Sequence, residues 1–106
     1  MTEPASPADG SARVDVLVRG RVQGVGYRMF VARVAATHGV TGWVANEPDG
    51  AVRCIAEGPR GVLEAFTREL AAGPPGAVVD KLSVAWSEAV DGFDRFAIRS
   101  GWHGGD

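Results

Sequence analysis

The first apolar pattern in this chain has a period of two. Valines occupy positions 14, 16 and 18, and they alternate with Asp15, Leu17 and Arg19. A period of two is typical of a β-strand, because successive side chains of a strand point to opposite faces of the sheet. The pattern therefore predicts a strand with one strongly apolar face near the start of the chain.

Two later segments repeat their apolar residues at helical spacing. The first extends from Tyr27 to His38, and Gly39 follows where a left-handed residue commonly ends a helix. The second begins at Gly58-Pro59, because proline is tolerated in the first turn of a helix. Its predicted buried stripe consists of Leu63, Phe66 and Leu70. Two helices are therefore expected, and the Gly-Pro-Pro-Gly sequence at 73–76 ends the second.

Four further strands are predicted. Val40–Asn46 and Ala51–Glu57 flank Glu47-Pro48-Asp49-Gly50, which has the composition of a tight turn, so these two segments should pair as a hairpin. Alternation at residues 82–86 predicts the next strand. After a turn at 91–92, Phe96–Arg99 is expected to form a short last strand.

The predicted order of elements is β-α-β-β-α-β with a short additional strand at the end. An antiparallel sheet with two helices on one face satisfies this order, and it is the ferredoxin-like α/β sandwich of the α+β class. Many unrelated functions use this topology, so the fold alone does not indicate a function.

The domain is expected to span residues 13–100. Residues 1–12 are rich in Pro, Ala, Ser, Asp and Gly, which predicts a disordered leader that takes no part in the fold. Residues 101–106 are expected to be a loose tail. A short chain with a leader and a tail is interpreted as a stand-alone protein.

The composition excludes several classes of protein. A formal net charge of −2 over 106 residues argues against nucleic-acid binding by bulk electrostatics. Cys54 is the single cysteine, so no internal disulfide can form. No apolar run approaches transmembrane length, and the first residues lack a basic segment followed by an apolar one. A cytoplasmic monomer without nucleic-acid or membrane partners is therefore expected.

The candidate chemistry begins in the glycine-rich stretch Gly20–Arg28. Glycine permits sharp turns and close approach, and N–H groups at a helix N-terminus bind anions. The backbone N–H groups from Gln23 to Arg28, closed by the Arg28 guanidinium, could therefore hold a phosphate. The alternative is an ordinary strand-to-helix connection with Arg28 in solvent. A cation at a helix N-terminus opposes the helix dipole, which favours the anion site.

Asn46 is the second candidate, at the end of a predicted strand. It could be a turn residue whose side chain caps local backbone groups, or a polar group presented to a site. The choice depends on whether the sheet order brings Asn46 close to the glycine-rich stretch.

A third candidate is the pair Cys54 and Arg60, which has the C-x5-R spacing of cysteine-dependent phosphatases. Cys54 should face the apolar side of its strand, Glu57 would repel a phosphate dianion, and Pro59 lacks an N–H group. A buried structural cysteine is the preferred interpretation. The histidines at 38 and 103 have no partners at ligand spacing, so no metal site is predicted.

Two motifs together carry a family resemblance. The first is Gly20-Arg21-Val22-Gln23-Gly24-Val25-Gly26-Tyr27-Arg28, and the second is Gly42-Trp43-Val44-x-Asn46-x-x-Asp49-Gly50-x-Val52. At this separation they resemble the signatures of the acylphosphatase family, and the resemblance covers about residues 13–100. Two departures are mild: Tyr27 occurs where phenylalanine is also usual, and Ala45 occurs where arginine is frequent.

The resemblance implies an enzyme that hydrolyses acyl phosphates to a carboxylate and inorganic phosphate without a cofactor. Arg28 would match the family's phosphate-binding arginine, and Asn46 the asparagine that positions the attacking water. The matching phosphate loop would consist of Val22, Gln23, Gly24, Val25, Gly26 and Tyr27. Inorganic phosphate or another oxyanion should occupy this loop. The alternative from another class is a non-catalytic anion-binding or interaction module, because similar domains also occur fused to larger carbamoyl-transfer proteins.

Overall fold

The computed structural model describes residues 11–90 and 92–100. Its elements are β1 (Ser11–Arg21), α2 (Tyr27–His38), β2 (Thr41–Asn46), β3 (Val52–Pro59), α3 (Arg60–Ala72), β4 (Val78–Glu88) and β5 (Phe96–Arg99). This is the predicted βαββαβ order with a short last strand.

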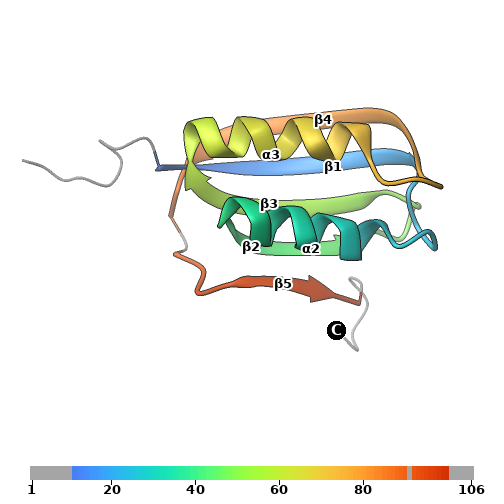
Figure 1. The fold of residues 1–106 in the computed structure, drawn as a ribbon, viewed down its shortest axis with the longest axis horizontal. Helices are drawn as coiled ribbons and strands as arrows, with labels where there is room; N and C mark the ends of the chain where they lie inside the picture. Colours follow the sequence, from blue (N-terminus) through green and yellow to red (C-terminus); the bar gives the residue numbers. More distant parts are fainter. Residues whose placement is uncertain (1–10, 91, 101–106) are drawn as a thin grey trace, which may run out of the picture.

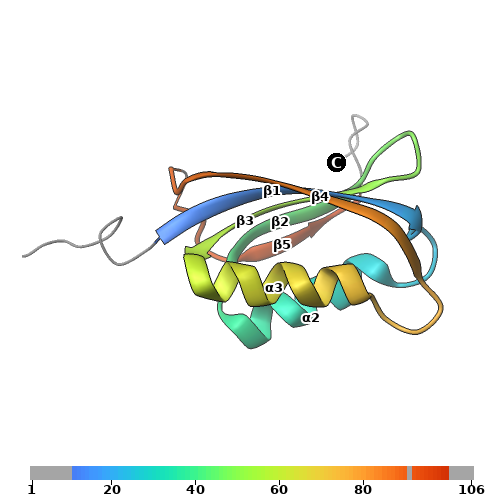
Figure 2. The ribbon, with the colours of Figure 1, turned by 90° about the horizontal axis from the view of Figure 1, so that it is seen from above.

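The five strands form one sheet in the order β4-β1-β3-β2-β5. Both helices lie on the same face of this sheet, and the other face has no helix on it (Figures 1 and 2). This arrangement is the predicted ferredoxin-like α+β fold. One detail differs from the prediction, because β5 pairs with β2 in parallel while all other neighbouring strands are antiparallel. The sheet is therefore mixed.

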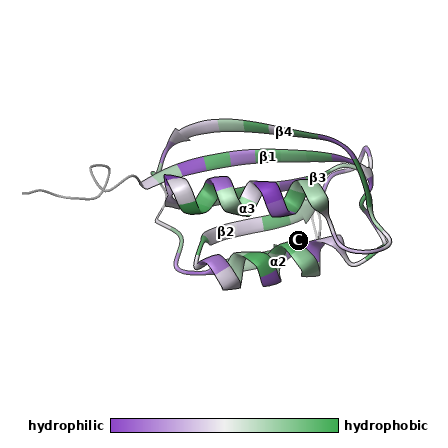
Figure 3. Ribbon diagram, turned by 45° about the horizontal axis from the view of Figure 1, so that its top comes forward, coloured by the Kyte–Doolittle hydropathy of each residue, from purple (hydrophilic) through white to green (hydrophobic). Residues whose placement is uncertain are grey.

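The core fills the space between the sheet and the two helices. Hydrophobic and hydrophilic residues alternate along β1 (Figure 3), and its valines at 14, 16 and 18 are completely buried. The helices contribute Tyr27, Val31, Leu63, Phe66 and Leu70 to the same cluster. The predicted stripe of α3 is thus confirmed, since burying apolar side chains on one face of a helix drives it onto a sheet.

The boundaries of β1 differ from the prediction at both ends. The strand begins at Ser11, because residues 11 and 12 already pair with β3 and the Ala12 side chain is buried. It continues to Arg21 through an irregularity in its pairing with β4 between Arg19 and Gly20. A Cβ at Gly20 would lie 2.0 Å from the Val78 carbonyl oxygen, so only glycine fits there. The predicted leader and tail otherwise fall on residues 1–10 and 101–106, outside the described part of the chain, as does Asp91 of the last predicted turn.

A buried carboxylate holds the segment that leads to β5. Glu57 is only 5% exposed and accepts hydrogen bonds from the backbone N–H groups of Val90 (2.9 Å) and Gly92 (3.0 Å) and from Arg13 Nη1 (3.2 Å). The backbone N–H of Gly42 then donates to the Arg95 carbonyl oxygen at 3.0 Å, where the pairing of β2 with β5 begins.

The loop between β1 and α2 and the turn between β2 and β3 lie at the same end of the molecule (Figure 1). Among the described residues, neither helix is long and apolar enough to span a membrane.

Candidate active site

The glycine loop, residues 22–26, connects the end of β1 to the start of α2. Gly24 and Gly26 have φ angles of 75° and 78°, which are left-handed conformations that other residues rarely adopt. Within the described residues, the backbone N–H groups from Gln23 to Arg28 donate to no acceptor. Such a run of unpaired amides at a helix N-terminus attracts anions.

Arg28 follows in the first turn of α2, where no acidic residue accompanies it. Its Nη1 donates to the Arg99 carbonyl oxygen of β5, and among the described residues no carboxylate pairs with its guanidinium. A cation at this end of a helix is unfavourable by roughly 0.3–1 kcal/mol unless an anion compensates it. The position of Arg28 therefore favours an anionic ligand.

Asn46 is the last residue of β2 and pairs with Val52 on β3. Its side-chain oxygen Oδ1 is buried and has no hydrogen-bond partner among the described residues. Leaving a buried polar atom unpaired costs about 1–3 kcal/mol. Asn46 is therefore not simply a turn residue that caps nearby backbone groups, because its Oδ1 makes no such bond.

A cleft of about 180 Å³ brings these candidates together. It is lined by Val22, Gly24, Gly26, Tyr27, Arg28, Met29, Asn46 and Ile98. The sheet order that the sequence left open does place Asn46 beside the glycine loop, because β1 and β2 flank the same strand and both reach this end of the sheet. Two predicted loop residues do not line the cleft: Val25 packs against the core, and the Gln23 side chain bonds the β2–β3 turn.

Met29 and Ile98 also line this cleft, and neither was predicted from the sequence as a site residue. They are 58% and 43% exposed, although both side chains are large and apolar. Met29 directly follows Arg28 in the helix, which was a usable signal. The place of Ile98 could not be read from the sequence, because it depends on the parallel pairing of β5 with β2.

Tyr27 is a buried structural residue at the start of α2 and not a reactive group. It is 1% exposed, and its hydroxyl donates to the Leu70 carbonyl oxygen at 2.7 Å. Burial raises the pKa of this phenol well above its ordinary value, so Tyr27 remains neutral. The phenol thereby ties the start of α2 to the end of α3.

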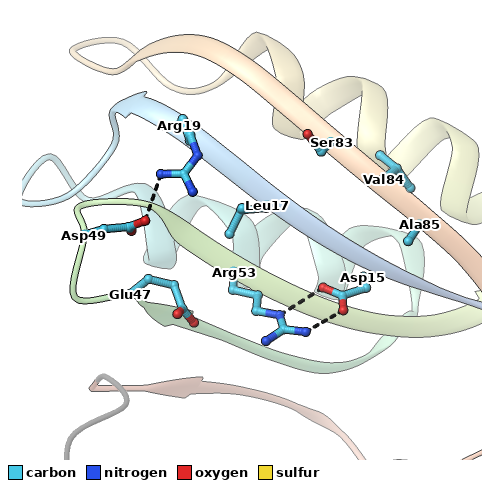
Figure 4. Close-up of a pocket in the computed structure, with 9 residues that line it drawn as sticks. All are labelled: Asp15, Leu17, Arg19, Glu47, Asp49, Arg53, Ser83, Val84 and Ala85. Atoms are coloured by element: carbon cyan, nitrogen blue, oxygen red, sulfur yellow. Dashed lines mark hydrogen bonds and ion pairs between the residues drawn. The ribbon is translucent and has the colours of Figure 1, made fainter.

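A larger cavity, about 430 Å³, lies on the sheet face without helices (Figure 4). Both of the arginines that line it are already paired. Arg53 donates to both oxygens of Asp15, at 3.0 and 2.5 Å, and Arg19 donates to Asp49 at 2.9 Å. The backbone N–H of Ala51 and then Arg19 lower the pKa of the Asp49 carboxyl, which keeps that pair charged. With its arginines paired, this cavity suits an anion less than the Arg28 cleft does.

The geometry does not support a cysteine-dependent phosphatase. Cys54 lies in the middle of β3 and is completely buried, and burial raises the pKa of its thiol well above the ordinary value. Arg60 instead stacks on Trp86, with its guanidinium carbon 4.2 Å from the ring centroid. The predicted structural role of Cys54 is thus supported.

His38, at the end of α2, contacts Glu69 of α3, with 2.6 Å between Nε2 and Oε2. This contact could not be read from the sequence, because it joins residues 31 apart. In the described part of the chain, no group of three or more His, Cys, Asp or Glu side chains could hold a metal ion. His103 lies outside that part.

The fold and the cleft define a ferredoxin-like α+β protein that presents unpaired backbone amides, an arginine and an asparagine in one place. The family model for acylphosphatase matches residues 14–98, and the chain belongs to the acylphosphatase family. Its activity is that of an acylphosphatase, a hydrolase. The resemblance read from the two motifs is confirmed.

Individual relatives are similar to this chain over nearly the whole domain. The acylphosphatase of Salinibacter ruber is 48% identical over 87 residues, which cover 82% of this chain and 92% of that relative. The crystal structure of acylphosphatase from Bacillus subtilis has a TM-score of 0.81 at 40% identity and covers 83% of this chain and 98% of that chain. The structure of T. kodakarensis HypF has a TM-score of 0.76 at 31% identity and covers 85% of this chain but 12% of that one. A similar domain thus also occurs within a much longer protein.

Proposed function

We propose that this acylphosphatase hydrolyses acyl phosphates by direct attack of a water molecule on the phosphoryl group. Arg28 and the backbone amides of the loop hold the phosphoryl oxygens, and Asn46 orients the water. The observation that carries the proposal is that Arg28 and Asn46 line one cleft of about 180 Å³. Among the described residues, Arg28 has no carboxylate partner and the side-chain oxygen of Asn46 is unpaired.

The phosphoryl group would lie at the N-terminus of α2. In a loose transition state its negative charge is spread over three equatorial oxygens. The N–H groups from Gln23 to Arg28 and the planar fork of Arg28 supply several donors for those oxygens. Since the Arg99 carbonyl and the helix already fix these donors, they need little reorganisation during the reaction.

The water would be held by Asn46. The Oδ1 atom accepts a hydrogen bond from the water. This bond directs a lone pair of the water oxygen at phosphorus, on the side opposite the acyl oxygen. An amide is too weak a base to take a proton, so the water proton passes to a phosphoryl oxygen of the substrate. A new P–O bond forms from the water oxygen, and the bond between phosphorus and the acyl oxygen breaks.

The leaving group explains why this site can work without a general acid. A carboxylic acid has a pKa of roughly 4 to 5, so the carboxylate leaves as an anion at neutral pH. Positioning and electrostatic stabilisation are then sufficient, and these are what Arg28, the loop amides and Asn46 provide.

The decisive experiment measures benzoyl phosphate hydrolysis by Arg28→Ala and Asn46→Ala. We expect kcat/KM to fall by about 10³-fold or more for Arg28→Ala and by about 10²-fold for Asn46→Ala, while circular dichroism remains native. Arg33→Ala, which changes an exposed arginine on the same helix, is the matched control and should retain full activity. Full activity of either site variant would contradict the assignment of that residue. Phosphate binding without turnover by the native protein would indicate a binding module instead.

We further propose that the chain acts as a cytoplasmic monomer. The free, fully buried Cys54 suits a reducing compartment. Sedimentation at micromolar concentration should give the mass of one chain.

A further inference from the structure

The Gln23 side chain leaves the glycine loop and crosses to the β2–β3 turn. Its Nε2 donates two hydrogen bonds of 2.8 Å each, one to the Glu47 carbonyl oxygen and one to the Ala51 carbonyl oxygen. Both acceptors are carbonyl oxygens, so only the NH2 end of the amide can face them. Both amide protons of Gln23 are therefore committed to this turn, away from any ligand of the loop.

The two carbonyl groups are the ones that close the turn. The backbone N–H of Glu47 donates to the Ala51 carbonyl oxygen at 2.8 Å, and that of Gly50 donates to the Glu47 carbonyl oxygen at 3.2 Å. Each carbonyl thus accepts one bond from the turn itself and one from Gln23. Glu47 directly follows Asn46, so these bonds act one residue away from the proposed water-orienting side chain.

The loop and the turn have no direct strand pairing between them. β3 lies between β1 and β2 in the sheet, so backbone pairing links Asn46 to β1 only through Val52 of β3. Side chains that bridge the loop and the turn add a direct link between the two segments. Among the described residues, Gln23 is the one side chain of the glycine loop that hydrogen-bonds to the β2–β3 turn. On the opposite face of the sheet, Arg19 bonds Asp49 of the same turn, but this pair is exposed and neither residue lines the cleft.

We propose that Gln23 is a positioning residue, whose side chain sets Asn46 at the correct distance from the phosphoryl group held by the loop. This inference rests on the proposed function. Gln23 serves both halves of the site: its backbone N–H belongs to the anion loop, and its side chain holds the hairpin that carries the water-orienting asparagine. Errors of about 1 Å in such positioning reduce rates by up to about 10²-fold.

Gln23→Ala and Gln23→Met test this role, because both remove the two donors and the second preserves the side-chain volume. We expect kcat for benzoyl phosphate to fall about 10- to 100-fold. The inhibition constant for inorganic phosphate should change by less than about threefold, since Arg28 and the amides remain. Arg19→Ala, which removes the link between β1 and the same turn on the other face, should retain the native kcat.

A double-mutant cycle separates positioning from general stability. If Gln23 acts through Asn46, its replacement should have almost no further effect on kcat in the Asn46→Ala background. An equal loss of kcat in both backgrounds, or a parallel loss of phosphate affinity, would overturn the proposal. If Gln23→Ala does not fold at the assay temperature, the kcat and phosphate affinity of Gln23→Met test the proposal in the same way. Full activity of Arg28→Ala would instead refute the proposed function, so the two failures are distinguishable.

Discussion

The Arg28 guanidinium donates a hydrogen bond from Nη1 to the backbone carbonyl oxygen of Arg99, 71 residues further along the chain. A carbonyl oxygen is neutral, so this bond fixes the direction of the guanidinium without cancelling its charge. Arg99 is itself held over Trp43, with its guanidinium carbon 4.4 Å from the ring centroid. The last strand of the sheet therefore orients the proposed phosphate-binding arginine and leaves its charge for a ligand.

Arg28 must both bond the Arg99 carbonyl oxygen and bind the ligand. Arg28→Lys should therefore reduce activity nearly as much as removal of the charge. Lysine is a point charge on a flexible stem, and it cannot bond the Arg99 carbonyl and two phosphoryl oxygens in one plane. We expect kcat/KM for benzoyl phosphate to fall about 10²-fold or more, with an unchanged melting temperature. Activity of Arg28→Lys within about threefold of the native enzyme would show that charge alone is sufficient.

The proposed mechanism also predicts a flat pH profile. Arg28 and Tyr27 are the titratable side chains that line the cleft. Arginine does not lose its proton in proteins, and burial raises the pKa of Tyr27 above its ordinary value. The kcat for benzoyl phosphate should therefore vary less than about twofold between about pH 6 and pH 9, measured in buffers of constant ionic strength. A bell-shaped profile within this range would reveal an acid or base that the mechanism lacks.

Tyr27 is expected to matter for stability rather than for chemistry. Its hydroxyl pairs with a carbonyl oxygen near the end of α3, where helical carbonyls otherwise lack partners. Tyr27→Phe should lower the free energy of unfolding at pH 7 by about 1–2 kcal/mol, measured in urea, with native kcat. A large loss of kcat with native stability would contradict this division of roles.

Tyr27 should also make the free energy of unfolding decrease with pH at high pH. The folded state raises the pKa of Tyr27 above 10.0, chiefly through burial, so its contribution is complete below that pH. As the pH rises above 10, the unfolded chain loses this proton while the folded chain keeps it, and stability falls. Tyr27→Phe should lack this component. The difference in free energy of unfolding between the two proteins should therefore shrink between pH 9 and about pH 11.

Local patterns were sufficient to predict most of the fold and to single out part of the candidate site. The alternation at Val14, Val16 and Val18 reports burial on one face, and burial is what holds β1 in place. Left-handed glycines and a cation at a helix start likewise leave a local signature, so the loop and Arg28 could be singled out. Asn46 could be named as a candidate, but whether it lies beside the glycine loop depended on the sheet order.

Contacts between distant segments could not be read from the sequence. The bonds from Gln23 to the β2–β3 turn join residues 24 and 28 apart, and no periodicity or propensity encodes them. The parallel pairing of β5 was missed for the same reason, since it depends on how the segment after β4 crosses to the far edge of the sheet. That pairing brings Ile98 to the cleft and the Arg99 carbonyl oxygen within hydrogen-bond distance of Arg28.

The exposed apolar residues at the cleft predict which acyl groups the enzyme prefers. Met29 and Ile98 are two of the four large hydrophobic side chains that the described residues leave exposed, and both line the cleft. Burying about 50 Å² of apolar surface against them is worth roughly 1.3 kcal/mol, close to tenfold in affinity. Benzoyl phosphate should therefore have a lower KM than acetyl phosphate, and Met29→Ser should reduce this difference about three- to tenfold with little change in kcat. Val78→Ser, which alters another exposed apolar residue that does not line the cleft, is the matched control. If Met29→Ser raised both KM values equally, it would have weakened phosphate binding instead, and the apolar residues would not select the substrate.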